Sequence, residues 1–214
     1  MVASHPAARV TCTAVLVGLG LAAVQVPARA QVAGRPSQET AYPGRYPFTE
    51  ADVHFVTGMI SHHAQAIVMA GWAPTHDASE AMRRLCDRII NAQTDEIVLM
   101  QAWLRDRNQP VPEAKPMPVK MMMNGMEHEM MMPGMLTDGQ IRQLDQARGG
   151  EFDRLFLTFM IQHHRGAVTM VEQLFNSPGA GQDEAVYKFT SDIYADQTTE
   201  IERMQKMLLT LPQR

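Results

Sequence analysis

The chain has 214 residues, 45% of them hydrophobic, which suits one domain with a substantial apolar core. Its formal net charge is −4 at pH 7, so a nucleic-acid partner, which would need a clustered basic surface, is not expected. Methionine is unusually common, with 18 residues against 7 phenylalanines and 4 tyrosines, and this bias has to be explained.

Residues 1–30 have the pattern of a secretory signal peptide. Arg9 precedes an apolar stretch over 10–26, and Ala28-Arg29-Ala30 is the small-x-small pattern that a signal peptidase reads. We expect cleavage after Ala30, a location in the periplasm or outside the cell, and no membrane contact of the mature chain. A retained membrane anchor is the alternative, because the apolar stretch is at the long end of the range for signal peptides.

The first helical hairpin is expected over 48–107, after a flexible lead over 31–47 that is rich in proline and glycine. Thr49 can cap a helix that runs to about residue 72, and Pro74 ends it. Asp77-x-x-Glu80 is a capping-box pattern, which predicts a second helix from about residue 78 to about residue 107.

Residues 108–136 are expected to form a long crossover linker, since several prolines and Gly125 oppose a stable helix there. No amphipathic pattern buries its methionines, and exposed thioethers would be prone to oxidation in an exported protein. Repeated Met-x-x-Met spacings would let a flexible loop wrap Cu(I) or Ag(I), to which a histidine adds a nitrogen. The candidate ligands are Met121, Met122, Met123, Met126, His128, Met130, Met131 and Met132. A docking surface for a protein partner is the alternative, because methionine-rich patches adapt to many shapes.

The second helical hairpin is expected over 137–210. Thr137 or Asp138 caps a short helix that is broken near Gly149-Gly150. A long helix is then expected over about 151–175 and a last helix over about 182–209, with Ser177-Pro178-Gly179 as the turn between them.

Both hairpins carry the same long motif. Residues 52–69 read DVHFVTGMISHHAQAIVM and residues 153–170 read DRLFLTFMIQHHRGAVTM, so both contain Met-Ile-x-His-His-x-x-Ala-x-x-Met. A second motif, Gln-x-x-Glu-Ile-x-x-Met, stands at 93–100 and recurs at 197–204. Duplication of one hairpin predicts an all-α fold, in which both halves form one four-helix bundle joined by the methionine-rich crossover linker.

The expected buried stripe of each half contains the same polar residues. With about 100° of rotation per residue, the aspartate, the histidine pair, the glutamine and the glutamate share the apolar face, whereas His54 lies well outside it. These residues are Asp52, His62, His63, Gln93 and Glu96 in the first half and Asp153, His163, His164, Gln197 and Glu200 in the second. A buried polar group without a hydrogen-bond partner costs about 1–3 kcal/mol. These residues should therefore hydrogen-bond to one another or bind a shared ion.

Imidazole beside thioether favours a soft or borderline ion, above all Cu(I), with Cu(II) possible through imidazole and carboxylate. Met59 and Met160 each stand one helical turn before a histidine pair. The expected copper ligands are therefore Met59, His62, His63, Met160, His163 and His164. The aspartates, glutamines and glutamates could ligate the ion or orient a histidine by a hydrogen bond. A purely structural hydrogen-bond network of the same residues is the alternative.

The two motifs resemble a bacterial ferritin-like family known as domain of unknown function 305 (DUF305). The resemblance covers about 48–105 and 136–210, including Leu136-Thr137-Asp138-x-Gln140 at the start of the second half. It implies a ferritin-like four-helix bundle in an exported or periplasmic protein. Some relatives are described as copper-binding through histidine and methionine, which implies ligands among the histidines and methionines named above.

We therefore expect a protein without enzymatic activity or organic cofactor, which sequesters or delivers copper and also accepts Ag(I). Copper-handling proteins of the envelope are its expected protein partners. A structural or interaction protein of the envelope is one alternative. A di-metal ferritin-like oxidase is another, although it needs Glu-x-x-His on two helices, and the residues three before the histidines are Met59, Ile60, Met160 and Ile161. No serine or cysteine stands in a nucleophile motif, so a hydrolase is not expected.

Overall fold

The computed structural model of the protein describes residues 47–123 and 126–212. Its helices are α1 (Glu50–Ala70), α2 (Glu80–Asp106), α3 (Asp138–Gln146), α4 (Gly150–Phe175) and α5 (Glu184–Thr210), and its strands are β1 (Val119–Met123) and β2 (Met126–Met130). The predicted signal peptide and nearly all of the predicted N-terminal lead lie outside the described residues. The fold is helical, as the sequence predicts.

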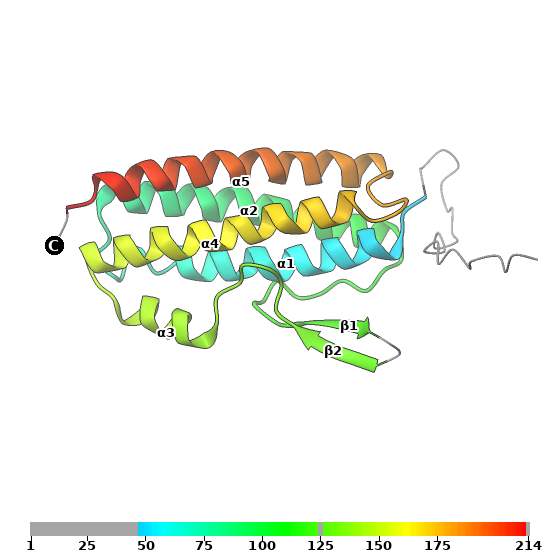
Figure 1. Cartoon of the computed structure of the whole chain (residues 1–214), viewed down its shortest axis with the longest axis horizontal. Coiled ribbons are helices and arrows are strands. Elements are labelled where there is room, and N and C mark those ends of the chain that lie inside the picture. The colour runs from blue at the N-terminus through cyan, green and yellow to red at the C-terminus, as the bar shows by residue number, and fades with distance from the viewer. Residues whose placement is uncertain (1–46, 124–125, 213–214) are drawn as a thin grey trace, which may run out of the picture. The chain divides into compact units, whose positions relative to one another are not determined.

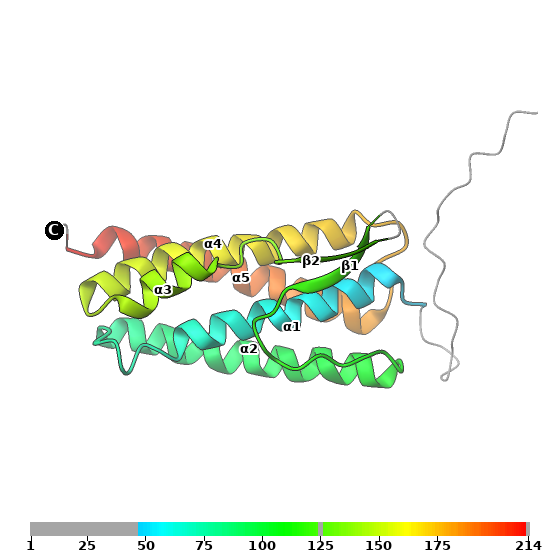
Figure 2. The ribbon, with the colours of Figure 1, turned by 90° about the horizontal axis from the view of Figure 1, so that it is seen from below.

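The four long helices form two hairpins that lie side by side (Figures 1 and 2). Helix α1 packs along α2, α4 packs along α5, and α1 contacts α4 to join the two hairpins. The short helix α3 packs against α4. Each of the two long motifs therefore lies on one of the helices, α1 or α4, that hold the hairpins together.

Local chemistry explains most helix boundaries. At the start of α1, Thr49 and Asp52 form a reciprocal capping box, and Thr137 and Gln140 form another at the start of α3. The expected capping box of Asp77 and Glu80 is not formed. Asp77 has a left-handed backbone with φ +53°, so α2 begins later and Ser79 caps it instead.

The linker, in which no stable helix was expected, contains two strands, and β1 and β2 pair as an antiparallel ribbon. Their register places Val119 opposite Met130 and Met123 opposite Met126. Helix α1 contacts β1, and the ribbon projects from the side of the helices (Figure 1). A signal for this ribbon was present in the sequence, since Asn-Gly between two short runs is the strongest short-range indication of a hairpin.

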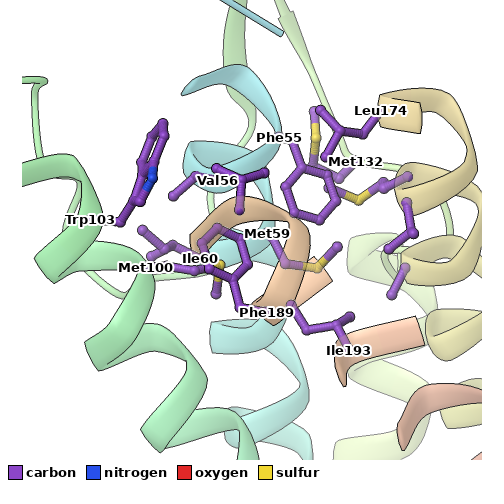
Figure 3. Packing of buried hydrophobic residues seen from close by; sticks show 14 of the residues in the cluster. Phe55, Val56, Met59, Ile60, Met100, Trp103, Met132, Leu174, Phe189 and Ile193 are labelled. Atoms are coloured by element: carbon purple, nitrogen blue, oxygen red, sulfur yellow. The ribbon is translucent and has the colours of Figure 1, made fainter. Parts of the chain in front are cut away.

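The buried apolar residues form two clusters, one toward each end of the long helices. The first contains Phe55, Val56, Met59, Met100 and Ile193, some of which Figure 3 shows in close packing. The second cluster is centred on α4 and the turn between α1 and α2. Its members include Met69, Met82, Leu85, Ile89, Phe152, Phe156 and Met160. The apolar core is thus divided, and what divides it is polar.

Candidate metal centre

A layer of buried polar residues separates the two apolar clusters on all four long helices. On α1 the first cluster includes Ile60, the second begins at Ala66, and the histidine pair lies between. On α2 Gln93 stands between Ile89 of the second cluster and Ile97 of the first. The same order recurs on α4 and α5, where the polar residues are His163, His164 and Gln197. We call these residues, together with Glu96 and Glu200, the polar layer.

The four histidines of the layer are fully buried. The rings of His62 and His163 face each other across α1 and α4, with 3.7 Å between centroids and 35° between planes. Within each pair the rings stand further apart, at 6.4 Å for His62 and His63 and 6.3 Å for His163 and His164. One histidine of each pair therefore meets its counterpart from the other hairpin, while the second points elsewhere.

The second histidine of each pair points to a glutamate of its own hairpin. The Nε2 atom of His63 lies 2.7 Å from Glu96 Oε2, and Nε2 of His164 lies 2.7 Å from Glu200 Oε2. The Nε2 atom of His62 lies 3.0 Å from the carbonyl oxygen of Pro133. Because carboxylate and carbonyl oxygens only accept, these three rings carry their proton on Nε2.

The other ring nitrogens have no partner. The Nδ1 atoms of His62, His63 and His164 are buried and make no hydrogen bond within the described part of the chain, and the same holds for both nitrogens of His163. The side-chain amide of Gln93 is likewise unpartnered at both atoms. Buried polar atoms normally have a hydrogen-bond partner. Several such atoms without one in a single layer therefore indicate a further partner such as an ion or water.

The central pair is uncharged at neutral pH. Burial, with a further contribution from neighbouring His63, lowers the pKa of His62 to about 3. Burial and the adjacent rings of His62 and His164 also lower the pKa of His163 well below its ordinary value. A neutral imidazole retains a lone pair, which is the form that binds metal ions.

The thioethers expected beside the histidines flank the layer. Met59 and Met160 are fully buried, the first in one apolar cluster and the second in the other. Cys86 adds no thiolate, because burial raises the pKa of its thiol to about 12. Sulfur next to the layer is therefore thioether sulfur.

Asp52 and Asp153 make hydrogen bonds with backbone groups at helix starts and turns, and their predicted role beside the histidines stays a prediction. Asp52 accepts from the backbone N–H of Thr49 and, with its other oxygen, from that of Gly181, each at 2.7 Å. Asp153 accepts from the N–H of Ser79 at 3.3 Å. Each carboxylate stands in the first turn of its helix, where it ties the start of one hairpin to the turn of the other.

The linker contacts α1 and α4 beside the polar layer, at residues that were not among the predicted site residues. Between the repeated positions of α1, Ser61 accepts from the N–H of Met117 at 2.8 Å, and Gln65 pairs with both backbone groups of Leu136, at 2.7 and 3.1 Å. On α4, a Cβ on Gly166 would lie 1.9 Å from the carbonyl oxygen of Pro133. These positions differ between the two repeats. That difference was the available signal that they hold something other than the common core.

The linker methionines were all expected to be exposed, but the two whose side chains are described nearest to α4 differ in exposure. Met131 is 42% exposed, whereas Met132 is 5% exposed and belongs to the first apolar cluster, where it packs over Gly58. No side-chain position is described for Met121, Met122, Met123, Met126, His128 or Met130. As ligands, all of these residues stay predictions.

The donor set of the layer fits a soft ion in chemistry but not yet in geometry. Among the described residues, no group of three or more histidine, cysteine, aspartate or glutamate side chains is arranged to hold a metal ion. With only 3.7 Å between their centroids, the rings of His62 and His163 leave no room for an ion between them. Neutral imidazole nitrogens, and the thioethers of the two flanking apolar clusters, are nevertheless donors that Cu(I) and Ag(I) prefer.

A family model described as "Domain of unknown function (DUF305)" matches residues 52–208, which include both motifs and all of the polar layer. The chain belongs to the DUF305 family. No curated protein matches it. Solved structures do match, and they agree with this assignment.

Two of these structures are DUF305 proteins. A candidate secreted protein from Streptomyces coelicolor is 28% identical with a TM-score of 0.62, over 74% of this chain and 92% of that one. A DUF305 fragment from Deinococcus radiodurans is 27% identical with a TM-score of 0.62, over 75% of this chain and 97% of its own. The match therefore covers nearly the whole length of both solved chains.

The third is CopM. In its Cu(II)-bound form it is 30% identical to the DUF305 chain, with a TM-score of 0.57, over 74% of this chain and 95% of that one. CopM has also been crystallised in Cu(I)-bound and Ag-bound forms. A protein similar to this one thus binds copper and silver. In the described residues of the DUF305 chain, no helix is long and apolar enough to cross a membrane.

Proposed function

We propose that this DUF305 protein is an exported metal-binding protein that sequesters or delivers copper, as Cu(I), and accepts Ag(I). The polar layer would bind the ion, with His62 and His163 at its centre and Met59 and Met160 beside them. The linker methionines would capture ions at the surface. The four long helices would then be a ferritin-like bundle built around this layer.

One observation carries the proposal. Three buried histidines donate Nε2–H to a carboxylate or a carbonyl, and each leaves Nδ1 buried without a partner. Histidines that bind metal ions have this arrangement, because a hydrogen bond at one nitrogen orients the ring and sets the lone pair on the other. In this reading Glu96 and Glu200 orient His63 and His164, and Pro133 orients His62.

The choice of copper and silver rests on donor chemistry and on CopM. Neutral imidazole and thioether are soft or borderline ligands, which disfavour Mg²⁺ and Ca²⁺. CopM, which is 27–30% identical in its metal-bound forms, binds Cu(I), Cu(II) and silver. Both arguments lead to the same ions.

The ion would be cargo rather than a catalyst. The Glu-x-x-His pairs of di-metal oxidases are absent from α1 and α4, and no nucleophile motif occurs in the chain. Export rests on the pattern of residues 1–30 and on the secreted description of the Streptomyces relative. A copper-handling protein of the envelope would be the partner that receives or supplies the ion.

Anaerobic titration with Cu(I) against a chromophoric chelator tests the proposal. We expect His62→Phe/His163→Phe to remove the tightest site, because phenylalanine fills the space of the ring without a lone pair. The matched control is His76→Phe, since His76 is also buried but lies beside Trp72 and Asp145, outside the layer. Equal affinity of the wild type, the double variant and the control would contradict the proposal.

A structural network is the second candidate, because Glu96 and Glu200 already hold His63 and His164 at Nε2 without an ion. It predicts that the His62/His163 double variant lowers the free energy of unfolding but leaves metal uptake unchanged. The same titration, with urea denaturation beside it, separates the two functions.

A further inference from the structure

A second group of soft donors lies outside the polar layer, in a cavity of about 350 Å³ between α1, α4 and the end of the linker. Four of its lining residues carry soft or borderline donor atoms: His54 from α1, Met131 and Met132 from the linker, and Met170 from α4. Its other lining residues include Phe55, Leu174 and Gln173, and none of the residues that line it is acidic. Figure 3 shows Met132 next to Phe55 and Leu174.

Two of the thioethers converge over Gly58. A Cβ at this glycine would lie 2.5 Å from the sulfur of Met132 and 3.4 Å from the terminal methyl of Met170. The sulfur-bearing ends of the linker and of α4 therefore meet at one point on α1. The second repeat has Phe159 in place of Gly58 and Leu155 in place of His54, so this convergence belongs to the first repeat alone.

The donors are graded from the surface inward. Met131 is 42% exposed, His54 is half-buried, and Met132 and Met170 are each 5% exposed. An ion could therefore reach the cavity through Met131 without unfolding of a helix. The next linker residue after Met132 is Pro133, whose carbonyl oxygen holds His62, so the cavity adjoins the polar layer.

We infer that this cavity, which we call the thioether pocket, is a surface-accessible site for a soft monovalent cation, Cu(I) or Ag(I), bound by His54, Met131, Met132 and Met170. Three neutral sulfurs and one imidazole without a carboxylate favour such a cation over hard divalent ions. The inference rests on the proposed function for the class of ion and for Met131 and Met132 of the linker, whereas His54 and Met170 are new ligands and none of the four belongs to the polar layer.

Methionine methyl resonances test the pocket directly. In the exported chain labelled at the methionine ε-methyl carbons, Ag(I) should shift the resonances of Met131, Met132 and Met170, and Mg²⁺ should shift none of them. Met69 serves as the internal control, because it occupies the place of Met170 in the other repeat and does not line the pocket. Unshifted resonances of all three, while the chain binds Ag(I) elsewhere, would overturn the pocket and leave the proposed function intact.

Stoichiometry provides the second test. His54→Gln/Met131→Leu/Met170→Leu keeps side-chain volume nearly unchanged, so the fold should persist. It should lose about one Cu(I) equivalent per chain, whereas Met69→Leu should lose none. An unchanged stoichiometry would overturn the pocket, and a wild-type chain that binds neither Cu(I) nor Ag(I) would overturn both proposals. If the triple variant unfolds, the methyl resonances of the wild type decide.

Discussion

His62 and His163 form an unusual contact for two buried side chains. Their ring centroids lie 3.7 Å apart with the planes tilted by 35°, and neither ring nitrogen of His163 has a hydrogen-bond partner within the described residues. Protonation of either ring would place a charge in the buried interior next to another imidazole, which is why the pKa values of both are lowered. The pair is stable only while both rings are neutral.

This neutrality makes stability depend on pH. Above about pH 6.5 both rings are neutral in the folded and the unfolded chain, and below it only the unfolded chain takes up protons on them. The free energy of unfolding should therefore decrease as the pH is lowered below about 6.5, by up to about 1.4 kcal/mol per pH unit for each ring. For His62 this decrease should continue down to about pH 3. Urea denaturation between pH 7 and about pH 5 checks this. His163→Phe should have a shallower pH dependence, and the same slope in both proteins would refute this explanation.

The glutamates should matter for affinity more than for folding. Glu96→Gln keeps the shape of the side chain but removes the charged acceptor of His63, so Cu(I) affinity should fall by about 10- to 100-fold. Glu202→Gln, on the exposed face of α5, is the control. Competition titration measures both, and an affinity equal to that of the control would show that Glu96 does not orient a ligand.

Among the structural elements, the linker is held at positions where the repeated helices α1 and α4 carry different residues. Gln65 holds the backbone of Leu136, whereas its counterpart Gly166 lets Pro133 and Gly134 lie directly on α4. A methyl group at Gly166 has no space, since its nearest neighbour is a backbone oxygen that cannot rotate away. The close approach of the linker to α4 therefore requires glycine at this position.

Gly166→Ala should displace the linker from α4 and lower the free energy of unfolding by about 1–3 kcal/mol, as overpacking of a filled site does. Gly139→Ala is the matched control, because its Cβ would meet only Thr137 Oγ1 at 3.8 Å on α3. Alanine is the better helix former, so the control should be neutral or slightly stabilised. Thermal denaturation followed by circular dichroism compares them. Equal melting temperatures would mean that the linker tolerates the extra methyl.

The helices were predictable because their signals are local. Thr49 and Thr137 cap helices through side chains three residues away, and the doubled His-His motif indicated that each half has the same interior. Asp52 and Met132 could not be placed in this way. The partner of Asp52 in the other hairpin, Gly181, is far away in sequence, and burial of Met132 depends on the space over Gly58. Such contacts exist only after the hairpins and the linker have packed.

At the scale of the whole molecule, a polar layer divides an apolar core and leaves several buried nitrogens and oxygens unpartnered. Each such atom costs about 1–3 kcal/mol unless something satisfies it. An ion in the layer would remove part of this cost in the folded state only, so binding should stabilise the protein.

Ag(I) or Cu(I) should therefore raise the melting temperature. At a free-ion concentration of about 100 times Kd, the gain in the free energy of unfolding is about 2.7 kcal/mol. The His62→Phe/His163→Phe variant should gain less than the wild type under the same conditions. Scanning calorimetry with and without the ion measures the effect, and an equal gain in both proteins would place the stabilising ion outside the layer.

A crystal structure of the exported chain with Ag(I), in which anomalous scattering locates the ion, tests most directly whether the polar layer binds metal. If the polar layer is a metal centre, a peak will lie within bonding distance of the free nitrogens of His62 and His163, with the two rings turned apart. Ag(I) only at the surface, with the rings still stacked and no peak beside them, would contradict a metal centre in the polar layer.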